Sequence, residues 1–175
     1  MTINDKKTLY EFWRFKVKEI YIEELGVKRQ YIEHPGAVSI IAINDEGRVL
    51  VQKHYRESVD KVLYELPAGL MEEDETPLET AKKELEEEEG YLADNWQELY
   101  TYYSSAGILA EKVVVFLATN LKKVNKKLEE TEKLTILESA FYDEEGLQEI
   151  IESGAPIAPM VATVAFGLKR IKERK

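Results

Sequence analysis

The segment from Gly69 to Tyr91, GLMEEDETPLETAKKELEEEEGY, concentrates most of the acidic charge of this chain. It holds ten acidic residues and two lysines, a local charge of −8 in a chain whose net charge is −10. Carboxylates at helical spacing repel each other at a cost of a few tenths of a kcal/mol per pair. The segment is therefore either a solvated acidic face or a site for a hard divalent cation such as Mg²⁺, which takes oxygen ligands.

The middle of this segment predicts a helix from about Pro77 to Glu89. Thr76 can cap its first turn, with Glu79 completing a capping box, and Gly90 can end it. At about 100° per residue, this helix places three carboxylates on one face: Glu84, Glu87 and Glu88. No lysine within the run from Glu86 to Glu89 offsets their repulsion.

The spacing decides between the two interpretations. From Gly69 the sequence runs Gly, five residues, Glu75, seven residues, Lys83-Glu84-Leu85, one residue, Glu87-Glu88, one residue, Gly90-Tyr91. This resembles the Nudix box, G-x5-E-x7-R-E-U-x-E-E-x-G-U, in which U is a bulky apolar residue. Lys83 stands where the box has arginine, and Tyr91 takes the last U position. The resemblance favours a metal site.

The Nudix resemblance implies hydrolysis of a nucleoside diphosphate linked to another group, with Mg²⁺ or Mn²⁺ held on the acidic helix. By the family pattern Glu84 and Glu88 are the principal metal ligands, Glu87 assists, and the carbonyl of Ala68 completes the set. Bound metal would offset the repulsion between the carboxylates and activate a water molecule. Glu75 and Lys83 match the pair that braces the loop against the helix, although lysine lacks the bidentate fork of arginine.

Four further segments resemble the ADP-ribose pyrophosphatase branch of the family: HPGAV (34–38), YR (55–56), ELPAG (65–69) and SSAGILAE (104–111). In that branch a segment like SPGFSDE follows the box. Here Ala106 replaces its proline, while Gly107 of the substrate-binding loop and Glu111 remain. The resemblance implies that Glu111 orients the attacking water or binds an additional metal; the alternative is a solvated loop residue.

The same resemblance implies three charged substrate residues. Arg56 matches the arginine that approaches the pyrophosphate, and its planar donors suit phosphate oxygens. Arg29 matches an arginine often supplied by the partner subunit, or is a surface charge. Glu65 is either a ligand beside the metal or pyrophosphate, or a partner of Lys83. An N-terminal aromatic residue is expected to stack on adenine, with four candidates: Tyr10, Phe12, Trp13 and Phe15.

The elements around these residues alternate between strands and helices. Aromatic and β-branched residues up to about residue 34 predict strands with a turn at Leu25-Gly26. AVSIIAI and NDEGRVLVQKHY predict two strands joined by an Asp-Glu-Gly turn. KVLYELPAG, KVVVFLATNL and LTILESAFY are further strands, and DEEGLQEIIESG and PMVATVAFGLKRIKERK are closing helices. We expect an α/β fold: a Nudix-type α/β/α sandwich with a mixed sheet, plus N-terminal antiparallel strands.

The domain organisation follows from these elements. We expect an N-terminal strand region (1–35), which forms a homodimer as is typical of the branch, and a Nudix domain (36–175). The absence of cysteine excludes disulfides and thiolate metal sites. A pI near 4.9 argues against duplex nucleic acid as a partner. No apolar run reaches the length of a membrane span or signal peptide, so we expect a soluble, cytoplasmic protein with no membrane partner.

These observations predict a Mg²⁺-dependent enzyme, with Mn²⁺ as a possible substitute, that cleaves ADP-ribose to AMP and ribose 5-phosphate. Two alternatives stay open. One is hydrolysis of another nucleoside diphosphate sugar or a dinucleoside polyphosphate. The other is a Nudix protein that binds a nucleotide without cleaving it, which the retained Glu84, Glu87 and Glu88 argue against.

Overall fold

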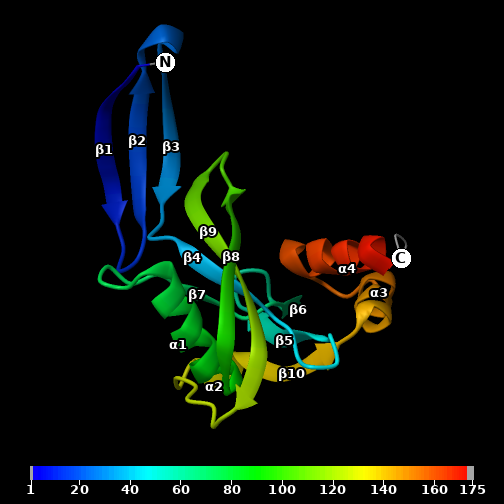
Figure 1. Cartoon of the computed structure of the whole chain (residues 1–175). Helices are drawn as coiled ribbons and strands as arrows, with labels where there is room; N and C mark the ends of the chain where they lie inside the picture. Colours follow the sequence, from blue (N-terminus) through cyan, green and yellow to red (C-terminus); the bar gives the residue numbers. More distant parts are fainter. Residues whose placement is uncertain (1, 173–175) are drawn as a thin grey trace.

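The structure, a computed structural model, describes residues 2–172, and three N-terminal strands stand away from the rest of the molecule (Figure 1). These are β1 (Ile3–Glu11), β2 (Lys16–Ile22) and β3 (Val27–Glu33), all antiparallel neighbours. A short 3-10 helix (Glu23–Leu25) ends at Gly26, whose φ of 62° is a left-handed conformation that glycine adopts without strain. The predicted strands and the turn at Leu25-Gly26 are confirmed.

The N-terminal strands continue into the main sheet of the domain. Its remaining strands are β4 (Ala37–Ala42), β7 (Ala68–Leu70), β8 (Tyr91–Ser105) and β9 (Leu109–Lys123). The order is β1-β2-β3-β9-β4-β7, and β8 pairs with β9. Both β3 and β4 run parallel to β9, whereas β7 and β8 are antiparallel to their neighbours, so the sheet is mixed.

A second, smaller antiparallel sheet has the order β10-β5-β6, with β5 (Val49–Arg56), β6 (Lys61–Glu65) and β10 (Ile136–Tyr142). The sequence correctly predicted strands β4 and β5 and the Asp-Glu-Gly turn between them, in which the N–H of Gly47 donates to the carbonyl of Asn44. A single bridge, Ile43 to Val49, is the pairing between them among the described residues. Over residues 37–39, β4 is paired on both edges, with β7 and with β9, so β5 cannot pair there and joins the smaller sheet.

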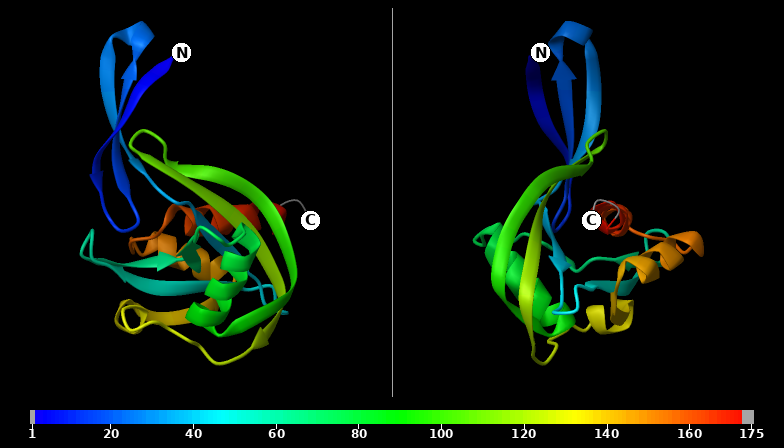
Figure 2. Two further views of the ribbon diagram at one scale, coloured as in Figure 1. Left: turned by 90° about the vertical axis from the view of Figure 1, so that its left-hand side faces the viewer. Right: turned by 45° about the vertical axis from the view of Figure 1, so that its right-hand side comes forward.

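Helices cover the two sheets on opposite faces, α1 (Pro77–Glu89) on one side and α3 (Glu144–Glu152) with α4 (Pro159–Lys172) on the other (Figures 1 and 2). Alternate residues of β4 divide accordingly: Val38 and Ile40 pack with Leu85 of α1, whereas Ile41 packs in the cluster with Leu147 and Val161. This alternation is the period of a strand whose two faces are both buried. The expected α/β/α sandwich is confirmed.

Three features were not anticipated from the sequence. The segment KVLYELPAG, predicted as one strand, forms two strands in different sheets, β6 and β7. The strand β8 pairs with β9 in a long curved hairpin (Figure 2), and a one-turn helix, α2 (Glu132–Thr135), precedes β10. The last predicted helix reached residue 175, and its positions 173–175 lie outside the described residues. Among the residues that the structure describes, no helix combines the length and apolarity needed to cross a membrane.

Candidate active site

Helix α1 has the boundaries that its sequence predicted. The hydroxyl of Thr76 accepts a hydrogen bond from the backbone N–H of Glu79, and the Glu79 carboxylate accepts one from the N–H of Thr76. Gly90, at φ 67°, ends the helix. Ala81 and Leu85 are fully buried against the sheet. This packing fixes the rotation of α1, and with it the direction of the neighbouring carboxylates.

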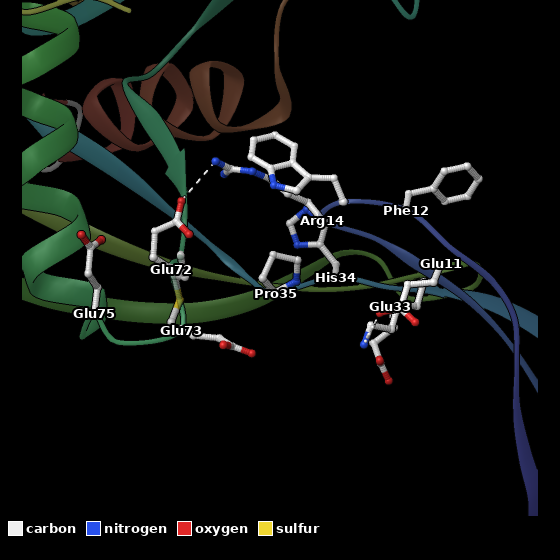
Figure 3. A pocket seen from close by; sticks show the side chains of 12 residues that line it. Glu11, Phe12, Arg14, Glu33, His34, Pro35, Glu72, Glu73 and Glu75 are labelled. Atoms are coloured by element: carbon white, nitrogen blue, oxygen red, sulfur yellow. Dashed lines mark ion pairs between the residues drawn. The ribbon is translucent and has the colours of Figure 1, made fainter.

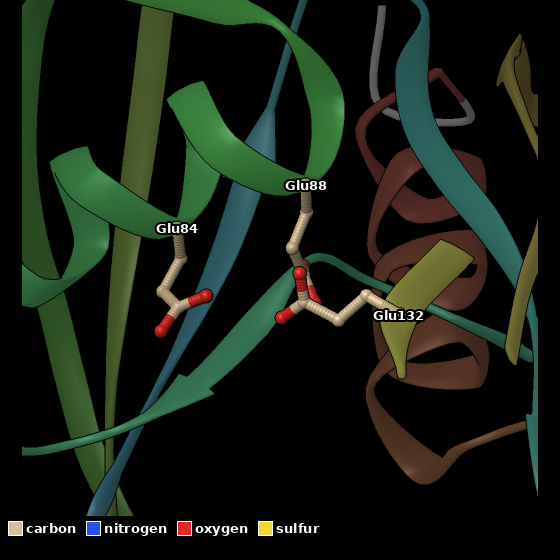
Figure 4. A group of neighbouring side chains, drawn as sticks. All are labelled: Glu84, Glu88 and Glu132. Carbon is tan, nitrogen blue, oxygen red and sulfur yellow. The ribbon is translucent and has the colours of Figure 1, made fainter. Parts of the chain in front are cut away.

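Three carboxylates from two helices meet beside α1 (Figure 4). Glu84 and Glu88 come from α1, and Glu132 faces them from α2. One oxygen from each lies within 4.8 Å of the others, and Glu88 is 3% exposed. The backbone N–H of Ala68 donates to Glu88 Oε2 at 3.4 Å. The cluster offers several oxygen donors within the reach of one cation.

The surroundings disfavour the charged forms of these carboxylates. Burial, together with the charges of Glu132 and Glu87, raises the pKa of Glu84 from 4.5 to about 7. Burial and the charge of Glu84 raise the pKa of Glu88 well above its usual range. In the part of the chain that the structure describes, neither Glu84 nor Glu88 forms an ion pair with a cationic side chain. Hard oxygen donors in this arrangement fit a divalent cation such as Mg²⁺.

The close approach of Glu84 requires a glycine at position 69. A Cβ at Gly69, in strand β7, would lie 2.0 Å from the carboxyl group of Glu84. Real side chains do not approach so closely, so any larger residue would displace the Glu84 side chain or the strand. The first glycine of the GLMEEDE segment therefore has a physical role in the cluster.

The cluster lies in an open cavity of about 770 Å³ between α1, α2, β7 and the turn that joins β1 to β2. Five predicted site residues line this cavity: Arg56, Ala68, Glu84, Glu87 and Glu88. Three of the four aromatic candidates also line it, namely Phe12, Trp13 and Phe15, whereas Tyr10 does not. The size of the cavity is in the range of small-molecule binding sites.

Arg56 is held by Glu65. Two guanidinium nitrogens of Arg56 donate to the Glu65 carboxylate, with a shortest distance of 2.6 Å from Nη2 to Oε2. The alternative partner of Glu65, Lys83, instead pairs with Glu75 at 3.3 Å. Glu75 also accepts a hydrogen bond from the hydroxyl of Thr80 at 3.0 Å. The predicted brace between Glu75 and Lys83 is present, and Thr80 supplies a second contact.

Four of the nine predicted site residues do not line this cavity: Glu65, which contacts Arg56, and Arg29, Gly107 and Glu111. Arg29 is exposed on β3, and Gly107 lies at the exposed tip of the β8–β9 hairpin. Glu111 approaches His34, with 3.4 Å between Oε1 and Nε2. Because His34 Nδ1 accepts a hydrogen bond from the N–H of Gly36, the ring proton is on Nε2 and faces Glu111. Within a single protomer Arg29, Gly107 and Glu111 do not reach the carboxylate cluster, and their functional roles stay predictions.

Glu132 is the cluster residue that the sequence analysis missed. It lies 44 residues after Glu88, in the stretch KKLEETEK, where Glu129 and Glu130 precede it. Such a mixed charge run is typical of a solvated loop. Its one possible signal is position, since the stretch comes just before the strand that leads back into the smaller sheet.

The helix, glycine and carboxylates described above are the arrangement of a known class of domain. A family model described as the NUDIX domain matches residues 33–158. The chain belongs to this family, as the acidic motif predicted.

Individual relatives have more specific names. The chain is 37% identical over 136 residues to a protein of Bacillus subtilis (strain 168) named ADP-ribose pyrophosphatase, covering 73% of this chain and 74% of the relative. It is 36% identical over 127 residues to a protein of Bacillus methanolicus named methanol dehydrogenase activator, covering 71% and 68%. Among solved structures, one titled "Crystal structure of ADP compounds hydrolase" matches with a TM-score of 0.75 at 20% identity, covering 98% of this chain and 94% of that chain. This last match supports the fold.

Proposed function

We propose that this protein hydrolyses the pyrophosphate bond of ADP-ribose, producing AMP and ribose 5-phosphate, in a metal-dependent reaction. The observation that carries the proposal is the cluster of Glu84, Glu88 and Glu132 in a cavity beside the Nudix helix. The substrate is suggested by the name of the Bacillus subtilis relative and by the HPGAV and ELPAG segments.

The metal is proposed to be Mg²⁺, with Mn²⁺ able to replace it. Glu84, Glu88 and Glu132 would hold it, assisted by Glu87 and the carbonyl of Ala68. When bound, such an ion neutralises pyrophosphate charge and lowers the pKa of a water molecule. Glu132 comes from a separate helix, and we propose that its carboxylate can also accept a proton from the attacking water.

The other residues of the cavity bind and orient the substrate. Arg56 presents its guanidinium at the cavity while Glu65 fixes its direction, so its remaining donors can meet phosphate oxygens. Glu75, Thr80 and Lys83 hold the start of α1 against the preceding loop. Precise placement of reacting groups contributes strongly to such reactions, because little covalent chemistry is left to the protein.

A homodimer is part of the proposal. The N-terminal strand region (1–35) leaves Ile3 and Tyr10 more than half exposed, as expected of a surface that a second copy covers. Arg29, Gly107 and Glu111 lie outside the cavity of their own protomer, and we propose that they act toward a site that the dimer completes. A cytoplasmic location is likewise a prediction.

A second candidate is hydrolysis of a different nucleoside diphosphate sugar or of a dinucleoside polyphosphate. Two observations favour keeping it: Ala106 replaces the proline of the branch, and the Bacillus methanolicus relative bears a name that mentions no ADP-ribose. A nucleotide-binding protein without turnover is the third possibility.

A substrate panel distinguishes these functions. The purified protein is incubated with Mg²⁺, then with Mn²⁺, and with ADP-ribose, other nucleoside diphosphate sugars or diadenosine polyphosphates, and products are separated by chromatography. Fastest release of AMP from ADP-ribose supports the proposal. Faster cleavage of another compound supports the second candidate, and intact compounds throughout support the binding protein.

A further inference from the structure

The turn between β1 and β2 places Arg14 at the cavity. The acidic motif does not predict this arginine. Arg14 lines both the cavity of the carboxylate cluster and an adjoining hollow of about 650 Å³. Its guanidinium lies 4.1 Å from the ring centroid of Trp13, and Nη2 lies 3.1 Å from Oε1 of Glu72 (Figure 3). Arg14 therefore reaches from the N-terminal strands to the loop that follows β7.

Three arginine or lysine side chains line the cavity among the described residues, and their carboxylate partners differ. Arg56 makes a bidentate contact with Glu65, whose side chain is 10% exposed. Lys83 contacts Glu75, which also holds Thr80. Arg14 contacts Glu72 at a single oxygen, and the Glu72 side chain is 50% exposed. An ion pair that is this accessible to water contributes little to stability and exchanges readily.

A diphosphate that binds in this cavity would need a further cationic side chain to offset its negative charge. Carboxylates outnumber the arginine and lysine side chains in its lining, and Arg56 already has part of its fork occupied by Glu65. A guanidinium matches phosphate oxygens with two parallel donors. The Trp13 ring lies against the Arg14 guanidinium, and stacking of this kind favours a fixed orientation of its plane.

We propose that Arg14 is a further substrate-binding residue, which releases Glu72 and binds the diphosphate of the substrate. This inference rests on the proposed function, since it assigns Arg14 to the same nucleoside diphosphate. Glu72 occupies the guanidinium in the absence of substrate and keeps it at the cavity. The substrate phosphate and the Glu72 carboxylate thus compete for the guanidinium of Arg14.

The competition predicts opposite effects for the two partners. Arg14→Met removes the phosphate contact, and we expect binding about tenfold weaker, as for the loss of hydrogen bonds to a charged group. Glu72→Gln frees Arg14, and we expect binding as tight as in the wild type or tighter. If the pair were only a structural tie between the turn and the loop, both substitutions would change binding in the same direction.

The experiment is calorimetric titration with adenosine 5′-(α,β-methylene)diphosphate in the presence of Mg²⁺, a probe whose bridge between the two phosphorus atoms is not hydrolysed. Arg48→Met, an exposed arginine outside the cavity, controls for loss of a positive charge. Glu73→Gln, next to Glu72, controls for loss of a negative charge. In the double variant, Arg14→Met with Glu72→Gln, any gain from Glu72→Gln should disappear. Thermal unfolding of each variant verifies that the fold is intact.

The outcomes separate this inference from the proposed function. Weaker binding for Arg14→Met with undiminished binding for Glu72→Gln supports the role of Arg14, even if the wild type prefers a substrate other than ADP-ribose. Equal effects of both substitutions, or no effect of Arg14→Met, overturn the role of Arg14, while cleavage of ADP-ribose by the wild type would still support the proposed function. A wild type that does not bind the probe would overturn the role of Arg14, whereas the proposed function is decided separately by the substrate panel.

Discussion

At the scale of single residues, Glu84 and Glu88 are unfavourable for the metal-free protein. Both are largely removed from water, close to each other and to Glu132, and without a cationic partner among the described residues. Buried charges without compensation destabilise a fold. Their presence in a cavity is a reason to regard them as functional, because desolvated carboxylates with raised pKa values cluster at sites of chemistry.

Replacing one ligand should separate stability from activity. Glu88→Gln keeps the shape of the side chain and removes a carboxyl group whose charged form is disfavoured by burial, so we expect an unchanged or higher melting temperature without metal. We expect activity to fall at least about 100-fold, since even residues that only support metal ligands often cost 10- to 100-fold. Activity assays and thermal unfolding measure both effects.

The control for that variant is Glu86→Gln. Glu86 lies on the same helix but pairs with Lys127 and does not line the cavity. Its activity should match the wild type. Wild-type turnover in Glu88→Gln would contradict the assignment of Glu88 as a metal ligand.

The raised pKa of Glu84 gives the metal-free protein a defined dependence on pH. The folded state holds this proton up to about pH 7, whereas the unfolded chain releases it near 4.5. Stability contributed by the protonated form is therefore lost as the pH rises across this interval. In EDTA, the melting temperature should decrease between pH 5 and pH 8.

Added Mg²⁺ should reverse that trend, because metal binding requires the ionised carboxylates. The increase in melting temperature caused by Mg²⁺ should be larger at pH 8 than at pH 6. A metal-induced increase that is the same at both pH values would mean that Glu84 does not take part in binding.

The residues of the site were predictable where spacing along one helix carries the information. The 3.6-residue period alone brings Glu84, Glu87 and Glu88 to one face of α1, and all three line the cavity. Glu132 could not be found in this way, because its approach depends on where the chain returns after β9. Periodicity describes neighbours within an element and contains no information on such long-range returns.

At the scale of elements, the site depends on how α1 packs on β7. The strand contributes backbone rather than side chains at this contact: the N–H of Ala68 meets Glu88, and Gly69 leaves room for Glu84. The capping box and Gly90 set the length of the helix, while buried Leu85 sets its rotation. Helix and strand together therefore place the carboxylates.

A methyl group at the helix–strand contact should disrupt this arrangement. Gly69→Ala would collide with the Glu84 carboxyl group, which is the far end of a flexible side chain and can move aside, so we expect a loss of less than about 1 kcal/mol in the free energy of unfolding. We also expect a weaker response of the melting temperature to Mg²⁺. Denaturant unfolding and metal titration measure the two effects.

Gly167→Ala provides the matched comparison. Gly167 lies in α4, and nothing is within 4 Å of a Cβ added there. This substitution should leave the Mg²⁺ response unchanged and add up to about 1 kcal/mol of stability, because alanine favours a helix more than glycine does. If Gly69→Ala behaved in the same way as Gly167→Ala, the contact would not matter.

The elements themselves were largely predictable, but their pairing was not. Hydrophobic period and capping signals located α1 and the strands β4, β5 and β9. The long strand β8 was missed because polar and aromatic residues mix along it without a clear alternation. The separation of β4 and β5 into two sheets is decided by competition for strand edges, which involves residues far apart in the chain.

At the scale of the whole molecule, the N-terminal strands carry large apolar side chains that are exposed to solvent. Ile3 is 55% exposed and Tyr10 67%, and both lie in β1. Surfaces of this kind are typical of interfaces. A dimer would also explain why Arg29 lies on the extension, away from the cavity of its own chain.

Light scattering after gel filtration tests the dimer directly. We expect a mass of twice the 20.2 kDa of one chain. The double variant Ile3→Ser with Tyr10→Ser should shift the protein toward monomer. These substitutions remove apolar area from the proposed interface. A wild type with the mass of a single chain at all concentrations would exclude the proposed assembly.

The attachment of β3 to β9 has a mechanical consequence. The strand pairing between β3 and β9 consists of two residue pairs, Ile32 with Leu109 and Glu33 with Ala110, and the N–H of Ile32 donates to the carbonyl of Ile108 at 2.7 Å. The exposed ion pair between Arg14 and Glu72 is a further contact between the N-terminal strands and the domain. Because the pairing of β3 with β9 is so short, a rotation of β1–β3 relative to the domain would change the backbone mainly at Ile32 and Glu33. The rate at which the Ile32 amide hydrogen exchanges with solvent would therefore report how often the N-terminal strands β1–β3 separate from β9.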